Sequence, residues 1–573
     1  MSEPSTEPSA MTDQYADPYA APHADTILVG GRVKTPSGWA EGLTVRAGVI
    51  ETVGGRDEVL RRRGPGTRVL DLAGATVLPG LHDLHVHPVY AGIRERRCKI
   101  PQGSDLTDTL RIVAEHVSRA APGTWVLGGQ WDASALGTVP DRTMLDAVAP
   151  GHPVVLEDTS GHSSWANSAA LEATGIGPTT PDPVGGFFER DAAGNPSGIQ
   201  REAAVDLLVA AAPKPADEEI EEALEWSLGE MLSYGITSFT EAAVGFTAGP
   251  RAELRAYTRL AARGAIRQRV RLCLVWSPVD PVCEDVIAAR NLCASPHLAP
   301  DCVKIFLDGV PTDSRTAAML EPYKDTAGRD DEAGRHGMLA IAPAVLDHAV
   351  TRFDRMGITV KFHAAGDAAV RAALDAIEAA RTANGHGPCM HNVGHSTFVT
   401  KTDIERAAQI GATFEVSPYL WQPSPICSDI AAAVGPEAVE RAWPVREMLA
   451  AGAPVVAGSD WSVVPSVNPW SAIETLVTRQ RPGGSPDSFG ASQAITLDQA
   501  FALFTANSAR QEGMAHRIGH IEPGLLADLV VVDPNPFEVP ITHVHATAVK
   551  MTFVEGDLVF DAGARRSGPA RSS

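Results

Sequence analysis

The sequence predicts an α/β protein: a (β/α)8 TIM barrel with a β-sandwich built from both ends of the chain and a large insertion after the first barrel strand. Short strand-like segments separated by glycine turns occur near both ends of the 573 residues. Between them, strand-like and helix-like segments alternate, as they do in a parallel barrel. The first two barrel strands are about 140 residues apart, far more than an ordinary βα connection requires.

The two ends of the chain are expected to form one domain. Residues 1–24 are rich in Pro, Ser, Ala and acidic residues and lack the basic start and apolar run of a signal peptide, so we expect a disordered tail. Strand-like segments begin at Thr26, and a matching set ends at Phe560. We therefore predict a composite β-sandwich from residues 25–79 and 519–562, with the barrel inserted between them so that its ends lie close together.

The barrel is predicted over residues 80–518, where eight strand-like segments match the number that closes a (β/α)8 barrel. An insertion at about 92–230 leaves the carboxyl end of the first strand, so it is expected to cover the active face as a lid or substrate subdomain. The predicted strands are Val77–Leu81, Ile236–Glu241, Val270–Val275, Val303–Leu307, Thr359–His363, Asn392–His395, Thr413–Val416 and Val455–Ser459.

A pair of histidines, His85 and His87, follows the short buried strand predicted at Thr76–Leu81. Histidines separated by one residue at the end of a strand point the same way, because strand side chains alternate between faces. Two converging imidazoles can bind a metal such as zinc. The pair alone is a weak indication, since exposed histidine pairs also occur by chance.

Other ionisable residues lie where later barrel strands end. His363, His395 and Asp460 end the fifth, sixth and eighth strands, and Lys304 lies inside the apolar fourth strand. Because a buried, unpaired ammonium is costly, Lys304 either points outward, pairs with Asp308 or has a functional role. Functional residues of barrels cluster at the strand ends, so the joint pattern predicts a site opposite the histidine pair.

Composition narrows the classes of partner and compartment. The chain has 48 basic and 70 acidic residues, a net charge of −22, which disfavours nucleic acid and anionic membranes as partners. No apolar stretch approaches a membrane span, so the cytoplasm is the default compartment. Seven scattered cysteines without a CxxC pair predict reduced, buried thiols rather than a disulfide framework. We expect a small-molecule substrate, and the sequence leaves a homodimer open.

The chain resembles the metal-dependent amidohydrolase superfamily, and within it the amidohydrolase-3 branch of YtcJ-like and N-substituted formamide deformylase-like proteins. The resemblance extends from Asp25 to Asp561. Besides the histidine pair, it rests on Gly128–Asp132, Gly161–Leu171, Asn195–Glu202, Val303–Gly309, His363–Val370, Gly458–Trp461 and Glu522–Leu529.

The resemblance implies a divalent-metal cofactor, with zinc the expected ion and one or two ions bound. It makes His85 and His87 ligands of the buried metal, and His363 and His395 ligands of a second one. Lys304 matches a lysine that is carboxylated to bridge two metals, and Asp460 matches a metal ligand that is also the catalytic acid/base.

The chain departs from the branch at its sixth barrel strand. The branch often has Arg-x-x-Glu-His there, whereas this chain has His391 to His395 with Gly394 in place of the glutamate. His391 is one candidate to compensate for it.

Aromatic residues of the insertion and of later loops are expected to shape a pocket for an apolar or aromatic substituent. The alternative is that these residues only pack the lid. The predicted substrate-binding residues are Trp131, His162, Trp165, Trp421 and Trp461.

The leading functional hypothesis is hydrolysis of an amide-type C–N bond, such as that of an N-substituted formamide or N-acyl compound, by metal-activated hydroxide. Three alternatives remain open at this point: a deaminase, a lyase or isomerase on the same scaffold, and a scaffold protein without catalysis. A deaminase of this superfamily usually has a glutamate shortly after the fifth-strand histidine, where this chain has Asp367. A scaffold protein would have lost metal ligands, whereas all six matched positions hold competent residues.

Overall fold

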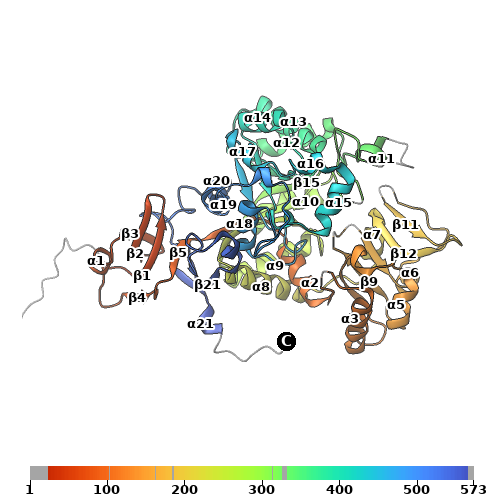
Figure 1. The fold of residues 1–573 in the computed structure, drawn as a ribbon, viewed down its shortest axis with the longest axis horizontal. Helices are drawn as coiled ribbons and strands as arrows, with labels where there is room; N and C mark the ends of the chain where they lie inside the picture. The colour runs from red at the N-terminus through yellow and green to blue at the C-terminus, as the bar shows by residue number, and fades with distance from the viewer. Residues whose placement is uncertain are drawn as a thin grey trace, which may run out of the picture.

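The computed structural model describes residues 23–101, 103–159, 161, 163–183, 186–312, 314–324 and 332–565. Residues 1–22 of the predicted tail therefore lie outside the described residues. Within the described ranges the chain forms three sheets. Figure 1 shows one sheet at one end of the molecule, the barrel in the middle and the insertion at the opposite end.

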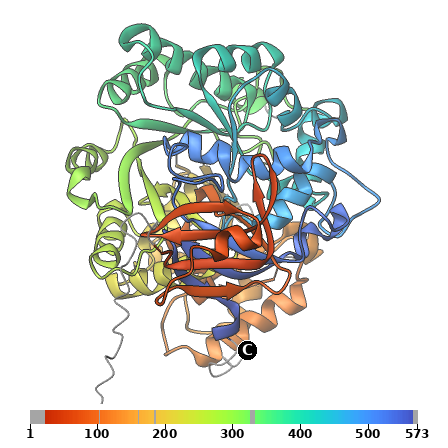
Figure 2. The same ribbon diagram turned by 90° about the vertical axis from the view of Figure 1, so that its left-hand side faces the viewer.

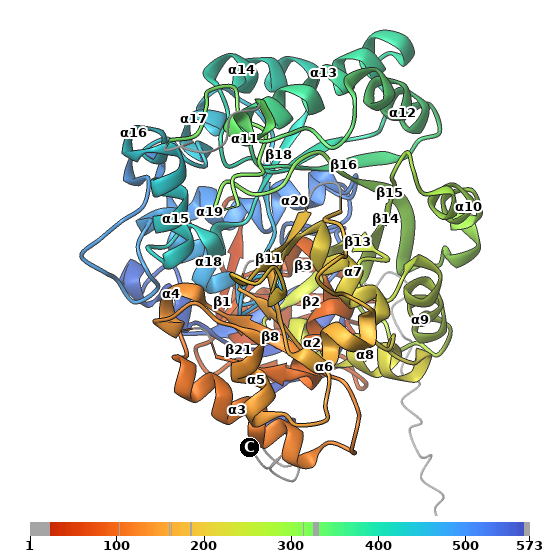
Figure 3. The ribbon, with the colours of Figure 1, turned by 90° about the vertical axis from the view of Figure 1, so that its right-hand side faces the viewer.

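The central sheet is a parallel eight-stranded barrel, which confirms the predicted fold class. The segment that follows its last strand is joined to the first strand by a parallel bridge between Trp461 and Val86. Helices surround the ring of strands (Figure 3). The strands, in order around the barrel, are β6 (Leu81–Val86), β13 (Ile236–Val244), β14 (Arg269–Val275), β15 (Leu298–Phe306), β16 (Thr359–Ala364), β17 (Asn392–His395), β18 (Thr413–Val416) and β19 (Val455–Ala457).

The outer helices bury one apolar face each against these strands. Helix α13, for example, buries Val370, Leu374 and Ile377, which are spaced three or four residues apart. The main outer helices are α8 (Asp217–Ser233), α9 (Pro250–Ala262), α10 (Pro281–Ala289), α12 (Pro343–Arg355), α13 (Asp367–Asn384), α14 (Lys401–Ile410), α17 (Val445–Ala450), α18 (Pro469–Thr478) and α20 (Ala506–Gln511).

The first barrel strand differs from the prediction. The segment β5 (Thr76–Pro79) pairs with strands of the terminal sheet, and the barrel strand begins only at Leu81. The chain crosses between the two sheets at Gly80, where a Cβ would lie 2.6 Å from Thr237 Cγ2. The predicted strand over 76–81 was wrong because the apolar run continues through this crossing. His85 consequently lies within β6 rather than after a strand.

Both ends of the chain contribute to the terminal sheet, as predicted from the two strand-rich regions (Figure 2). β5 pairs with β1 on one side and with β20 on the other. The hydrophobic core on this terminal sheet contains Leu28, Leu43, Val77 and Val531. The sheet consists of β1 (Thr26–Thr35), β2 (Gly38–Arg46), β3 (Val49–Gly54), β4 (Arg68–Asp71), β5, β20 (Leu529–Asp533), β21 (Ala548–Val554) and β22 (Asp557–Asp561).

The insertion has its own sheet and its own hydrophobic cores. It lies in front of the barrel in Figure 3 and is connected to β6 through α2 (Pro88–Arg96). Its strands are β7 (Cys98–Lys99), β8 (Val126–Trp131), β9 (Val154–Asp158), β10 (Ser163–Ala166), β11 (Gly186–Arg190) and β12 (Pro196–Glu202). Across the described ranges, the helices are too short or too polar to span a membrane.

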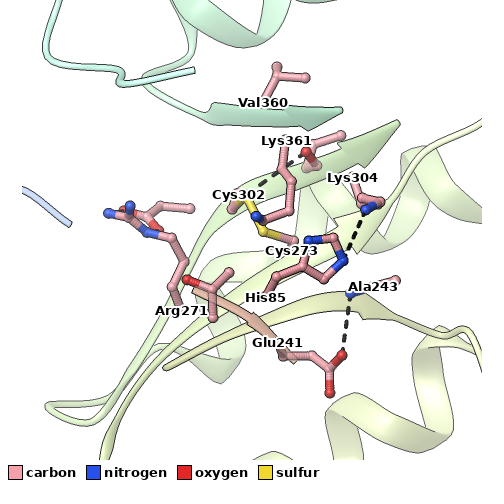
Figure 4. The surroundings of a disulfide bond; sticks show 12 residues. His85, Glu241, Ala243, Arg271, Cys273, Cys302, Lys304, Val360 and Lys361 are labelled. Atoms are coloured by element: carbon pink, nitrogen blue, oxygen red, sulfur yellow. Dashed lines mark hydrogen bonds and ion pairs between the residues drawn. A yellow bond between two sulfur atoms is a disulfide. The ribbon is translucent and has the colours of Figure 1, made fainter. Parts of the chain in front are cut away.

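A disulfide joins Cys273 of β14 to Cys302 of β15 (Figure 4). The prediction of reduced thiols was therefore wrong for this pair. The parallel register places the two residues opposite each other with a Cα–Cα distance of 4.3 Å, a relation that their spacing in the sequence does not reveal. The other five cysteines are free and buried.

Candidate metal centre

Three predicted ligands from the first and last barrel strands converge at the carboxyl ends of the strands. Asp460 Oδ1 lies 3.3 Å from His87 Nε2 and 3.5 Å from His85 Nε2, and all three residues are buried. Two ligand atoms at the usual distance from a tetrahedral zinc ion lie about 3.3 Å apart. These side chains therefore fit one shared divalent cation.

The backbone around Asp460 is fastened to the first strand. Asp460 N–H donates to His85 O at 2.6 Å, and His87 N–H donates to Trp461 O at 2.7 Å. The two segments approach so closely that a Cβ at Gly458 would lie 2.5 Å from His85 Cβ. Asp460 itself has a φ of 59°, a left-handed conformation that aspartate tolerates better than most residues. The ligands are thus held by main-chain bonds between two strands.

Hydrogen bonds to the outer ring nitrogens orient the histidines. His85 Nδ1–H donates to Glu415 Oε1 at 2.7 Å, and His363 Nε2–H donates to Gly309 O at 3.0 Å. The Glu241 carboxylate lies 3.4 Å from His87 Nδ1. The partners of His85 and His363 fix the tautomer and leave the opposite nitrogen free to bind a metal, whereas among the described residues His87 Nδ1 makes no hydrogen bond. The hydrogen bonds of His85 and His363 thus determine which ring nitrogen faces the site.

Lys304 points into the barrel and not toward the outer helices. Its Nζ lies 3.5 Å from His85 Nε2 (Figure 4). Asp308 is not its partner, because that carboxylate accepts the backbone N–H groups of Ala318, Ala365 and Gly366. Burial lowers the pKa of Lys304 to about 8, although Asp460 acts in the opposite direction. A lowered pKa increases the fraction of neutral amine, which is the form that reacts with carbon dioxide.

The remaining predicted ligands complete the cluster. The His363 and His395 rings are 4.2 Å apart, and His395 is 5.0 Å from the His85 ring, measured between centroids. His395 Nδ1 lies 3.9 Å from Asp460 Oδ2. All six residues predicted for the metal site thus lie together, on five different strands or the loops that follow them.

The electrostatics of the ligands differ. Burial lowers the pKa of His87, but the nearby carboxylates of Asp460 and Glu241 outweigh this and raise it to about 9, so a metal must displace a proton from His87. Burial holds the pKa values of His85 and His395 well below their usual range, which keeps both imidazoles neutral. Burial raises the pKa of Asp460, but the hydrogen bond from His87 and the charges of His395, His87 and Lys304 lower it below its ordinary value. The carboxylate is therefore ionised and available to a metal.

The four tryptophans predicted to bind substrate are buried. Trp131 and Trp165 pack in a core of the insertion, where their indole N–H groups donate to Leu156 O and Asp141 O. These partners give both side chains a packing role. His162, predicted to contact substrate, lies outside the described residues.

Trp421 and Trp461 are also packed, although closer to the barrel mouth. Trp421 stacks on Trp443 with 5.3 Å between the ring centroids, and the Arg479 guanidinium lies 4.3 Å from its centroid. Trp461 contacts Trp226 and lines a small cavity of about 40 Å³ between α2, the insertion and the loop after β19.

Two phenylalanines that were not among the predicted site residues lie beside the ligands. Phe246 is 52% exposed and stacks on His87, with 5.5 Å between centroids. Its ring also faces Phe306 at 6.4 Å, and Phe306 lies 5.8 Å from His363. Phe306 is two residues after Lys304 on β15, so strand alternation could have placed it on the same face.

Four buried charged residues of the barrel strands were also missed: Asp83, Glu241, Lys361 and Glu415. The signal that identified Lys304, a charge in an apolar strand, applies to them equally. His391 does not replace the missing glutamate at position 394. Its Nδ1 accepts a hydrogen bond from Val360 N–H and its Nε2 contacts Asp354 Oδ1 at 3.0 Å, away from the ligands.

Comparisons with known proteins agree with this geometry. A family model described as "Amidohydrolase family" matches residues 68–560. The chain is 27% identical to the putative amidohydrolase YtcJ of Bacillus subtilis (strain 168), covering 91% of this chain and 96% of that protein. It is 29% identical to N-substituted formamide deformylase of Arthrobacter pascens, covering 94% and 98%.

A solved structure has the same fold. The crystal structure of an uncharacterized metal-dependent hydrolase from Pyrococcus horikoshii OT3 superimposes with a TM-score of 0.70 at 22% identity, covering 90% of this chain and 99% of that one.

Proposed function

This chain belongs to the amidohydrolase family, a family of metal-dependent hydrolases, and we propose that it cleaves an amide-type C–N bond of a small substrate. The observation that carries the proposal is the convergence of His85, His87 and Asp460 at distances that suit one divalent cation. Lys304, His363 and His395 are proposed to hold a second ion, which is supported by the 4.2 Å between the His363 and His395 ring centroids and the 3.5 Å between Lys304 Nζ and His85 Nε2. The ligand set of imidazoles and carboxylate favours zinc.

The chain's residues have distinct roles in the proposed hydrolysis. A bound divalent ion acidifies water and polarises the carbonyl group of the substrate. Asp460 accepts the proton of the attacking water and delivers it to the leaving nitrogen. Lys304, if carboxylated, would be the residue that helps to hold a second ion. Carboxylation converts a costly buried cation into an anionic ligand.

The substrate is proposed to carry an apolar or aromatic substituent. Phe246 and Phe306 support this, because they form an aromatic wall directly beside His87 and His363. One relative is named N-substituted formamide deformylase, so formamides with alkyl or aryl substituents are the first compounds to test.

The test is a screen of N-formyl, N-acyl, carbamate and cyclic imide compounds with the metal-loaded enzyme, followed by release of amine. We expect amine release that a chelator abolishes and that the Asp460→Asn variant lacks. Amine release that persists in the metal-free protein would contradict the proposal. Turnover of a substrate without C–N cleavage would instead support lyase or isomerase chemistry.

A further inference from the structure

Beneath the proposed metal ligands, three side chains from three different barrel strands form a closed group. Glu415 of β18 accepts a hydrogen bond from His85 Nδ1 of β6 through Oε1 at 2.7 Å. Its second oxygen, Oε2, is ion-paired with Lys361 Nζ of β16. The side chains of Glu415 and Lys361 are fully buried, and that of His85 is 1% exposed. Of the described residues, His85 and Lys361 are the ones that hydrogen-bond Glu415.

From this geometry we propose that Glu415 is the positioning residue of His85 and that Lys361 is retained to neutralise Glu415. The inference rests on the proposed metal centre, which it extends from the ligands to the residues that hold them. The hydrogen bond to Nδ1 leaves His85 Nε2 without a proton and facing Asp460 Oδ1 at 3.5 Å. Loss of the bond would free the imidazole to change tautomer or to rotate.

Lys361 has a different task, because its Nζ is paired with Glu415 rather than with a ligand. A carboxylate buried without a counter-charge is costly, and so is a buried ammonium. Placed together, each offsets part of the penalty of the other. Glu415 can thus remain charged in the barrel interior, where a charged acceptor holds the His85 N–H more strongly than a neutral one.

Gly394 provides the space for this arrangement. It lies on β17, the strand between β16 and β18, and its register partners are His363 on one side and Glu415 on the other. A Cβ at Gly394 would lie 2.7 Å from Phe362 O, and 3.6 Å from both Glu415 Oε2 and His85 Nδ1. Any longer side chain there would occupy the volume in which the Glu415 hydrogen bond is made. The glycine at position 394, where the amidohydrolase-3 branch often has glutamate, therefore accompanies the buried Glu415–Lys361 ion pair.

Metal affinity and melting temperature together distinguish a role of Glu415 in positioning His85 from a purely structural role. Glu415→Gln keeps the shape but removes the charge, and we expect a metal affinity about 10–100-fold lower, the usual effect of losing an outer partner of a ligand. Lys361→Met leaves Glu415 uncompensated, so the metal-free protein should melt at a clearly lower temperature. In the double variant Glu415→Gln/Lys361→Met, the melting temperature should recover while the metal affinity stays low.

The experiment is chelator competition on metal-loaded enzyme, together with melting curves in excess chelator. Asp354→Asn is the matched control, because Asp354 is paired with buried Arg381 away from the ligands, and it should change stability only. Wild-type metal affinity in Glu415→Gln, or additive loss of stability in the double variant, would overturn the proposal. A wild-type enzyme that binds no divalent ion would instead overturn the proposed function and this inference with it.

Discussion

Replacing Gly458 by alanine is expected to weaken metal binding without altering any ligand side chain. The added Cβ would lie 2.5 Å from His85 Cβ and 2.8 Å from His85 Cα. To reach an ordinary contact of 3.4 Å, the two segments must separate by about 0.9 Å. His85 and Asp460 lie on opposite sides of that contact, so the 3.5 Å between their ligand atoms would grow. Metal sites tolerate only about 0.2 Å of error in ligand distance.

We therefore expect Gly458→Ala to lower metal affinity at least ~10-fold, and to lower the free energy of unfolding by about 1–3 kcal/mol, the usual cost of overpacking. Chelator competition measures the first quantity and urea denaturation of the metal-free protein the second. Gly387→Ala is the control, because a Cβ there meets nothing within 4 Å. Wild-type metal affinity in Gly458→Ala would refute the reasoning, since the strands would then separate without moving the ligands.

Three further predictions concern the ligands themselves. Asp460→Asn should keep the fold, because asparagine also tolerates the left-handed backbone at φ 59°. Its turnover should fall about 10²–10⁴-fold. Near-normal turnover with bound metal would exclude the acid/base role of Asp460. Lys304→Ala should lose activity that short carboxylates partly restore, and an intact mass without an added carboxyl group in fully metal-loaded enzyme would count against carboxylation. His85→Ala should contain no metal by elemental analysis and show no activity; full activity would remove His85 from the ligand set.

The barrel and the grouping of its polar residues could be predicted because both follow from local pattern. Parallel strands end at the same face, so a histidine or aspartate after a short apolar segment is placed there by topology alone. His363, His395 and Asp460 lie together for this reason. The first strand was misplaced because the apolar residues on either side of Gly80 form one continuous run in the sequence, although they belong to two sheets.

What the sequence could not predict depends on register and packing between distant segments. The Cys273–Cys302 disulfide and the Lys361–Glu415 pair exist only because particular residues of neighbouring strands face each other. Burial of the tryptophans is also a tertiary property. The sequence around Trp131 is compatible with a place in a pocket wall and with a place in a core, and only the sheet of the insertion distinguishes the two.

The pairing of β5 with β20 has a consequence for how the protein is made. Val77 must pair with Val531, so the two halves of the terminal sheet are separated by almost the whole chain. At ordinary elongation rates of roughly 5–20 residues per second, about 20–90 s pass on the ribosome between their synthesis. During that interval one edge of β5 lacks its partner and is open to wrong pairing. The first barrel strand, β6, therefore follows a sheet that is complete only after β20 has been synthesised, and rare codons before β20 would lengthen the vulnerable period.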